Sequence, residues 1–232
     1  GDVDQAAAEG AETEQVVPRF SGVDLVMPPD TVNANPESNA RRNAYFGDLH
    51  VHTNYSFDAF AFGTVASPYD AYRFAKGEAI EHPAGFDVQL QAPLDFYAVT
   101  DHAMFLGAVK EAADTTTEFS RYDHVQGLHN LNAPENQNFD SIPDRGAAFT
   151  TFLPDTLAKV GDGSIDPDLI NQIAKDAWSD TIRAAEAFND PGNFTTFVAY
   201  EFTSSTDDRG NLHRNVIFQG ADRLPAMPFS RF

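Results

Sequence analysis

Two histidines, His50 and His52, stand one residue apart within residues 45–52, a run that is typical of a β-strand. Side chains alternate between the two faces of a strand, so both imidazoles should point the same way. Two imidazoles on one face can bind a single metal ion. A pair of ordinary buried or surface histidines is the alternative, and this motif alone does not separate the two.

Three later strand-like runs also deliver residues of the types that bind metals. Residues 94–100 lead into Asp101 and His102, residues 194–200 lead into Glu201, and residues 212–218 contain His213 near their start. In α/β barrels and open parallel sheets, sites form at the carboxyl ends of the strands. Packing alone rarely produces four strands that all carry such residues, so we expect one shared metal site.

These motifs, together with Asp58, resemble the metal motifs of the polymerase-and-histidinol-phosphatase (PHP) superfamily. Residues 45–59 are similar to the corresponding stretch of the DUF3604 family within that superfamily, and the resemblance extends over residues 42–232. One feature departs from the usual pattern, because Asp58 lies one residue farther from His52 than the motif normally places its aspartate.

The resemblance implies an α/β fold that forms part of a distorted seven-stranded β/α barrel, with a two- or three-metal site. It implies a metal-dependent hydrolase of ester bonds, most often a phosphoesterase. The chain would divide into an extended arm (1–41) and the N-terminal portion of the barrel (42–232), with a polar insertion at about 113–165 that could cover the site. The implied metal ligands are His50, His52, Asp58, His102, Glu201 and His213.

Imidazoles and carboxylates together suit Zn²⁺, Mn²⁺ or Fe, and two such ions about 3.5–4 Å apart can clamp the oxygens of a phosphoryl transfer. The candidate catalytic residues are Asp101, Glu201 and Asn215. Glu201 could bridge two ions. Asp101 either binds an ion or orients a histidine or a water. Strand alternation should turn Asn215 toward the ions and Arg214 away from them.

Two helices are predicted around these strands. The first begins at Pro68 with Ser67 as its N-cap and runs to about Glu78. The second covers residues 167–189 and places Trp178 on its apolar, core-facing side. His124 and His129 lie in the polar insertion, where we interpret them as ordinary loop residues rather than as spare ligands.

Composition narrows the class of protein and of partner. The chain has 232 residues, no cysteine and a net charge of −20, so thiolate ligands are excluded and a nucleic-acid or anionic-membrane partner is not expected. No apolar run approaches the ~20 residues of a membrane span. The sequence contains neither a phosphate-binding glycine loop nor a nucleophile elbow. We therefore expect a small-molecule phosphate or related ester as the substrate.

Only four core strands are recognisable, fewer than the about seven of the resembled barrel, and no histidine follows His213. We therefore expect a second polypeptide segment to complete the barrel and the metal site. The acidic, small-residue start of the chain favours a periplasmic or secreted protein after signal-peptide removal, with a cytoplasmic location as the alternative. The alternative function is a non-catalytic metal-binding or structural module of a larger assembly.

Overall fold

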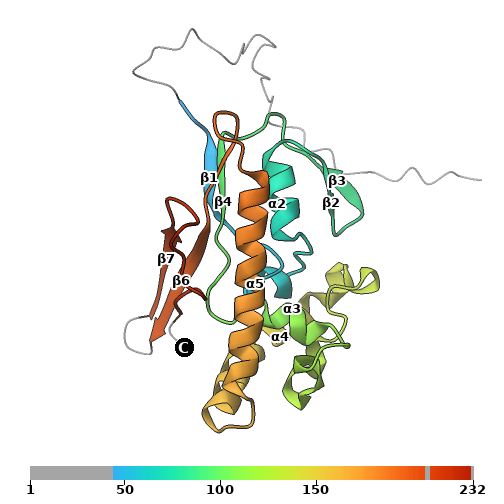
Figure 1. Ribbon diagram of the computed structural model, residues 1–232. Coiled ribbons are helices and arrows are strands. Elements are labelled where there is room, and N and C mark those ends of the chain that lie inside the picture. The colour runs from blue at the N-terminus through green and yellow to red at the C-terminus, as the bar shows by residue number, and fades with distance from the viewer. Residues whose placement is uncertain (1–43, 207–209, 231–232) are drawn as a thin grey trace, which may run out of the picture. The chain divides into compact units, whose positions relative to one another are not determined.

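A computed structural model describes residues 44–206 and 210–230 (Figure 1). The arm predicted at 1–41 lies outside the described residues. The strands are β1 (Gly47–Val51), β2 (Ile80–His82), β3 (Phe86–Val88), β4 (Phe96–Val99), β5 (Thr195–Thr196), β6 (Ala199–Thr206) and β7 (Gly210–Ile217). The α-helices are α1 (Phe57–Ala61), α2 (Pro68–Ala75), α3 (Ala108–Ala113), α4 (Ile142–Gly161) and α5 (Pro167–Phe188). Short 3-10 helices are η1 (Phe119–Arg121), η2 (Asp123–Leu128), η3 (Pro134–Asn136) and η4 (Phe139–Ser141).

A three-stranded parallel sheet in the order β1-β4-β5 holds the first two predicted strands side by side. Gly47 pairs with Phe96 at the start of β1 and β4. A Cβ atom on Gly47 would clash with the Phe96 carbonyl oxygen and with the Phe96 ring. The close approach of β1 and β4 therefore requires glycine at this position.

The described residues form no closed barrel. Beside the parallel sheet, β2 and β3 form one antiparallel pair, and β6 and β7 form another. The strand predicted at 212–218 is present as β7, but it runs antiparallel to β6 rather than as a member of a parallel sheet. The reason is the short interval between the two strands, residues 207–209, since a parallel connection needs a crossover of a dozen or more residues. The predicted strand at 194–200 is also interrupted, at Phe197 and Val198, between β5 and β6.

Both predicted helices are present. The Ser67 hydroxyl accepts a hydrogen bond from the backbone N–H of Asp70, and the Asp70 carboxylate accepts one from the Ser67 backbone N–H, which together form a capping box at α2. Helix α2 ends at Ala75, shortly before Gly77 with its φ of +86°. The sequence analysis did not predict α4, which contains Gly146 and Pro154, two residue types that disfavour helix interiors.

Two apolar cores support these elements. The first lies between the parallel sheet and helices α2 and α5, which run side by side in Figure 1, and it contains Tyr72, Tyr97 and Trp178. The second gathers α1, α3 and α4 around Phe105, Phe119 and Phe152. No helix among the described residues has the length and apolar character needed to cross a bilayer.

Arg145 is buried at the second core without a carboxylate partner among the hydrogen bonds of the described residues. Its guanidinium donates to the carbonyl oxygens of Ala61, Leu131 and Asn136 and to the side-chain oxygen of Asn132. Burial lowers the pKa of this guanidinium below its ordinary value. A planar group with five donors can satisfy several backbone oxygens at once, so Arg145 fastens α4 to α1 and to the loop before α4.

Candidate metal centre

The segment that follows β4 lies between the end of β1 and the start of β6. The Thr100 N–H donates to the Val51 carbonyl oxygen over 2.7 Å. On the other side, the Glu201 N–H donates to the Asp101 carbonyl, and the Ala103 N–H donates to the Glu201 carbonyl, both over 2.9 Å. This short continuation of parallel pairing carries the chain past the end of β4. As a result, the chain segments that carry His50, His102 and Glu201 lie side by side.

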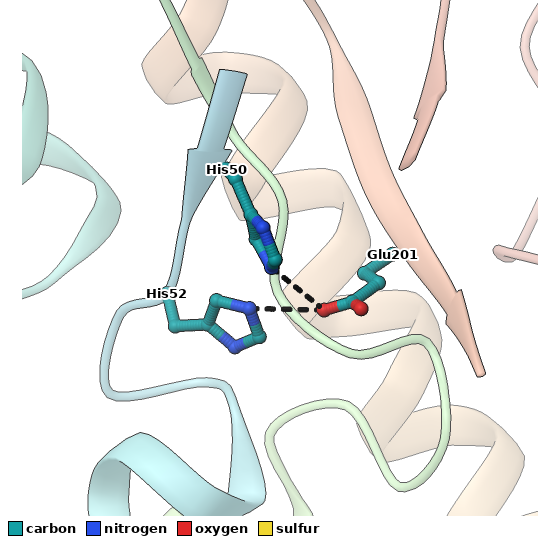
Figure 2. Close-up of side chains that lie close together, drawn as sticks. All are labelled: His50, His52 and Glu201. Atoms are coloured by element: carbon teal, nitrogen blue, oxygen red, sulfur yellow. Dashed lines mark ion pairs between the residues drawn. The ribbon is translucent and has the colours of Figure 1, made fainter. Parts of the chain in front are cut away.

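The carboxylate of Glu201 lies at the centre of the candidate site (Figure 2). Its Oε2 is 2.9 Å from Nε2 of His52 and 3.4 Å from Nε2 of His50. The same oxygen is 3.5 Å from Nδ1 of His102. Glu201 is only 1% exposed, and its Oε2 has no hydrogen-bond partner. A buried carboxylate oxygen that faces three imidazole nitrogens is the arrangement expected around a cation.

Two further side chains extend the cluster. Asp58, from the first turn of α1, places Oδ1 3.5 Å from Nδ1 of His52 and Oδ2 3.3 Å from Nε2 of His102. His213, from β7, places Nδ1 2.5 Å from Oε1 of Glu201. In the antiparallel pair, His213 lies opposite Thr203, so it faces the same side of the hairpin as Glu201.

The structure therefore brings together all six side chains that the sequence analysis named as metal ligands. Among the described residues they form three overlapping groups in which the potential ligand atoms all lie within 4.8 Å of one another. The groups are His50, His52 and Glu201; His52, Asp58 and His102; and His102, Glu201 and His213. Imidazole and carboxylate donors of this kind fit Zn²⁺, Mn²⁺ or Fe. The groups could hold a metal ion, and the donor types do not select which one.

One side of the cluster is open to solvent. The His50 and His213 side chains are 60% and 40% exposed, whereas those of His102 and Glu201 are 4% and 1% exposed. The buried side is backed by Phe57, whose ring stacks on His102 at a centroid distance of 4.9 Å. Phe149 of α4 stacks on Phe57 in turn, at 5.9 Å. The predicted insertion thus supports the cluster from behind.

Asp101 and Asn215, two of the predicted catalytic residues, lie outside the three metal-binding groups. The buried Asp101 carboxylate accepts hydrogen bonds from the N–H of Thr53 at 2.5 Å and from its hydroxyl at 2.6 Å. Asn215 lies opposite Glu201 in the hairpin, and its amide donates to the Leu49 carbonyl of β1 over 2.7 Å. Asp101 therefore fixes the turn after His52, and Asn215 fastens β7 to β1.

Two hydroxyl groups contact the histidines, and the sequence analysis gave them no role. Ser56 Oγ lies 2.7 Å from Nδ1 of His52, and Thr203 Oγ1 lies 2.6 Å from Nδ1 of His102. Strand alternation could have found Thr203, because it lies two residues after Glu201 on the same face of β6. Ser56 lies on no regular element before α1, so only the folded loop brings it to His52.

His124 and His129 lie apart from the candidate centre, as expected of ordinary loop residues. Nε2 of His124 is 3.2 Å from the Thr156 hydroxyl of α4, and Nε2 of His129 is 2.9 Å from the Ser120 carbonyl oxygen. Neither belongs to a metal-binding group of the described residues. Both histidines instead join parts of the 113–165 segment to one another.

The charges in the metal-free cluster shift the pKa values of its members. Burial lowers the pKa of His52, but the carboxylates of Asp58, Asp101 and Glu201 outweigh it and hold that pKa above 6.5. Burial raises the pKa of Asp58, and the neighbouring imidazoles of His102 and His52 more than reverse this, leaving it well below its usual range. Burial raises the pKa of Asp101 to about 6, although the hydrogen bonds from Thr53 act in the opposite direction.

The raised pKa of His52 predicts that acidification weakens metal binding but stabilises the metal-free protein. A metal ion needs the neutral imidazole, so metal affinity should begin to fall at a pH above 6.5 as the solution is acidified. In the metal-free protein the same shift contributes stability that is fully present below pH 6.5 and is lost as the pH rises through the raised pKa. Metal titrations in a pH series, with thermal unfolding of the metal-free protein, measure both. An affinity that stays constant down to pH 6.5 would contradict the expectation.

The fold and the cluster define a class: a mixed α/β protein whose described residues include His/Asp/Glu groups able to hold metal ions. The chain belongs to the DUF3604 family, since the family's sequence model, described as "Protein of unknown function (DUF3604)", matches residues 39–232. The predicted resemblance to this family is thereby confirmed. No curated protein and no solved structure matches the chain.

Proposed function

We propose that this protein is a metal-dependent hydrolase of ester bonds, with a phosphate ester as its substrate. We further propose that it is a member of the PHP superfamily, whose motifs its sequence resembles, and that its cluster holds two or three divalent ions. The proposal rests on the candidate metal centre, on the types of its donors and on its opening to solvent.

The observation that carries the proposal is the environment of Glu201. Its buried Oε2 accepts no hydrogen bond and lies within 3.5 Å of nitrogens from His50, His52 and His102. A buried, unsatisfied carboxylate oxygen is costly in a folded protein unless a cation compensates it. The three imidazoles come from two separate chain segments, so local sequence does not explain their convergence.

In this proposal, six residues would bind the ions and two others would hold the surrounding backbone in place. His50, His52, Asp58, His102, Glu201 and His213 would hold the ions. When bound, divalent ions supply an activated water and stabilise the oxygens of a phosphoryl group. Asp101 would keep the turn after His52 in place through Thr53, and Asn215 would hold β7 against β1.

A purely structural metal module is the competing function. A structural site closes its coordination sphere with protein ligands, whereas a catalytic site keeps a position open. The 60% exposure of His50 and the 40% exposure of His213 favour the catalytic proposal, because solvent and a small ester could approach from that side.

Changing His52 to alanine tests the proposal. The protein, loaded separately with Mn²⁺, Zn²⁺ or Fe, is assayed against phosphomonoesters, phosphodiesters and phosphonate esters. We expect ester hydrolysis by the parent protein and at least a ~100-fold loss in His52→Ala, because even groups that only orient a metal ligand cost about 10- to 100-fold when removed. The matched control is His82→Ala, since His82 is an exposed strand histidine outside the metal-binding groups.

Two results would contradict the hydrolase proposal. One is a metal-loaded parent protein without activity on any ester of the panel, which would favour the structural module. The other is a His52→Ala protein as active as the parent. Circular dichroism of each variant separates a loss of ligand from a loss of fold.

A second polypeptide segment that completes the barrel remains part of the proposal. Within residues 44–206 and 210–230, β1 pairs with β4 alone among the strands, and Phe46 just before it is 69% exposed. An unpaired strand edge is a template for a further strand. Such a segment could also add ligands on the open side of the cluster.

A further inference from the structure

His52 and His102 each lie between the carboxylates of Asp58 and Glu201, but the nitrogen that is near each carboxylate differs between the two rings. Nδ1 of His52 is 3.5 Å from Asp58 and its Nε2 is 2.9 Å from Glu201. For His102 the order reverses, because Nε2 is 3.3 Å from Asp58 and Nδ1 is 3.5 Å from Glu201. Either ring could therefore serve an ion beside either carboxylate. The carboxylates alone do not decide which nitrogen binds.

The two hydroxyl groups of the site distinguish the two nitrogens of each ring, because both hydroxyls contact Nδ1. Ser56 Oγ lies 2.7 Å from Nδ1 of His52, and Thr203 Oγ1 lies 2.6 Å from Nδ1 of His102. Ser56 is 0% exposed and Thr203 is 3% exposed, so both contacts are shielded from solvent. Ser56 Oγ also accepts a hydrogen bond from the backbone N–H of His102, at 3.2 Å, which ties the two histidines to one hydroxyl.

The opposite nitrogen of His52 makes no hydrogen bond to Glu201. Oε2 of Glu201 is 2.9 Å from Nε2, yet it accepts no hydrogen bond, so an N–H at this position would not point at it. A proton on Nδ1, by contrast, points at the Ser56 hydroxyl. The nitrogen of an imidazole that carries the proton is set by the hydrogen bond that it makes, and the other nitrogen then offers its lone pair.

We infer that Ser56 and Thr203 are positioning residues that hold His52 and His102 in the form protonated on Nδ1, and so direct both Nε2 atoms to metal ions. Nε2 of His52 then serves an ion beside Glu201, together with His50. Nε2 of His102 serves a different ion, beside Asp58. The hydroxyls thereby assign the two inner histidines to separate ions.

This inference rests on the proposed function only where it assigns nitrogens to metal ions. The protonation of Nδ1 can be tested without a metal, and this is the first test. Protein with ¹⁵N-labelled histidine is stripped of metal with a chelator and studied by long-range ¹H–¹⁵N NMR, at a pH well above the ordinary imidazole pKa of about 6.5. We expect the pattern of the Nδ1–H form for two rings, assigned to His52 and His102 by their loss in the alanine variants. Nε2–H patterns for both rings would overturn the inference.

The second test compares two variants of Thr203. Thr203→Val removes the hydroxyl at nearly constant shape, whereas Thr203→Ser keeps it. We expect Thr203→Val to lose the Nδ1–H preference of His102 and to bind one Zn²⁺ ion about 10- to 100-fold more weakly, as measured by calorimetry and by metal content. Thr203→Ser should match the parent protein in both measurements. Ser56→Ala makes the same test for His52.

The outcomes separate the two proposals. A Thr203→Val protein with the same tautomers and the same Zn²⁺ affinity as Thr203→Ser would overturn the role of the hydroxyl. A parent protein that shows both Nδ1–H patterns and binds no ion would overturn the proposed function while supporting the hydroxyls as the groups that set the tautomers. If Thr203→Val does not fold, Ser56→Ala is used in the same NMR experiment. An unchanged Nδ1–H pattern for His52 in that variant would overturn the role of the hydroxyl.

Discussion

Replacing Glu201 with glutamine should remove tight metal binding while leaving the metal-free fold intact. The carboxylate contacts His50, His52 and His102 through one oxygen and His213 through the other, so its charge is shared by most of the cluster. We expect Zn²⁺ affinity to fall by more than about 100-fold, because residues that only orient a ligand already cost about 10- to 100-fold. Calorimetric titration and metal content after dialysis measure the loss.

Thermal unfolding gives a second readout for the same variant. An ion present at about 100 times its Kd stabilises the parent protein by about 2.7 kcal/mol, which corresponds to roughly 5–10 °C in a chain of this size. Glu201→Gln should lose this metal-dependent rise and keep a similar metal-free Tm, since Oε2 has no hydrogen bond to lose and the amide oxygen of glutamine can still serve as the partner of His213 that Oε1 is now. Glu186→Gln, an exposed change in α5, is the control that should keep the rise. A Glu201→Gln protein with the parent's metal content would show that the cluster does not bind ions through this carboxylate.

Replacing Trp178 with alanine should produce the largest loss of stability in the first core. The side chain is 1% exposed, and its ring packs edge-on against Tyr200 at a centroid distance of 5.8 Å. Its Nε1–H donates to the Pro225 carbonyl oxygen over 2.9 Å. Truncation of a buried Trp costs about 3–5 kcal/mol through lost transfer energy and a residual cavity, and the unpaired carbonyl adds to this. Urea unfolding, with the slope compared between variants, measures the change.

The packing argument can be checked against an exposed aromatic residue. Phe86 is 54% exposed in the β2–β3 hairpin, so Phe86→Ala should change the free energy of unfolding by less than about 1 kcal/mol. Trp178→Phe should fall between the two, because it keeps part of the ring volume but loses the bond to Pro225. A Trp178→Ala protein as stable as Phe86→Ala would mean that α5 does not rest on the sheet through this side chain.

The local features of this protein follow from short stretches of sequence. His50 and His52 share a direction because strand side chains repeat every two residues. Ser67, Pro68 and Asp70 start α2 because the capping contacts span only three residues. Trp178 falls on the buried side of α5 because apolar residues recur at helical spacing. Each of these required only neighbours in the chain, which is why sequence reasoning was sufficient.

The helix α4 shows where local reasoning failed. Gly146 and Pro154 lower the helix propensity of this segment. Burial of Phe152 in the second core and the hydrogen bonds of Arg145 to distant carbonyls outweigh that propensity. Helices in proteins are stabilised mainly by such tertiary packing, so propensity alone did not reveal this one.

The sequence by itself determined the chemical types of the candidate centre, six imidazole and carboxylate side chains without sulfur, and the strands that carry several of them. The tertiary structure alone decided how they meet. It set the β6–β7 hairpin in the register that puts His213 on the same face as Glu201. It also folded Ser56 and Thr203 against the two inner histidines. The contact of Thr203 with His102 joins residues 101 positions apart in the chain. The others depend on the register of a hairpin and on the path of a loop, and these are set by the packing of the whole domain rather than by local pattern.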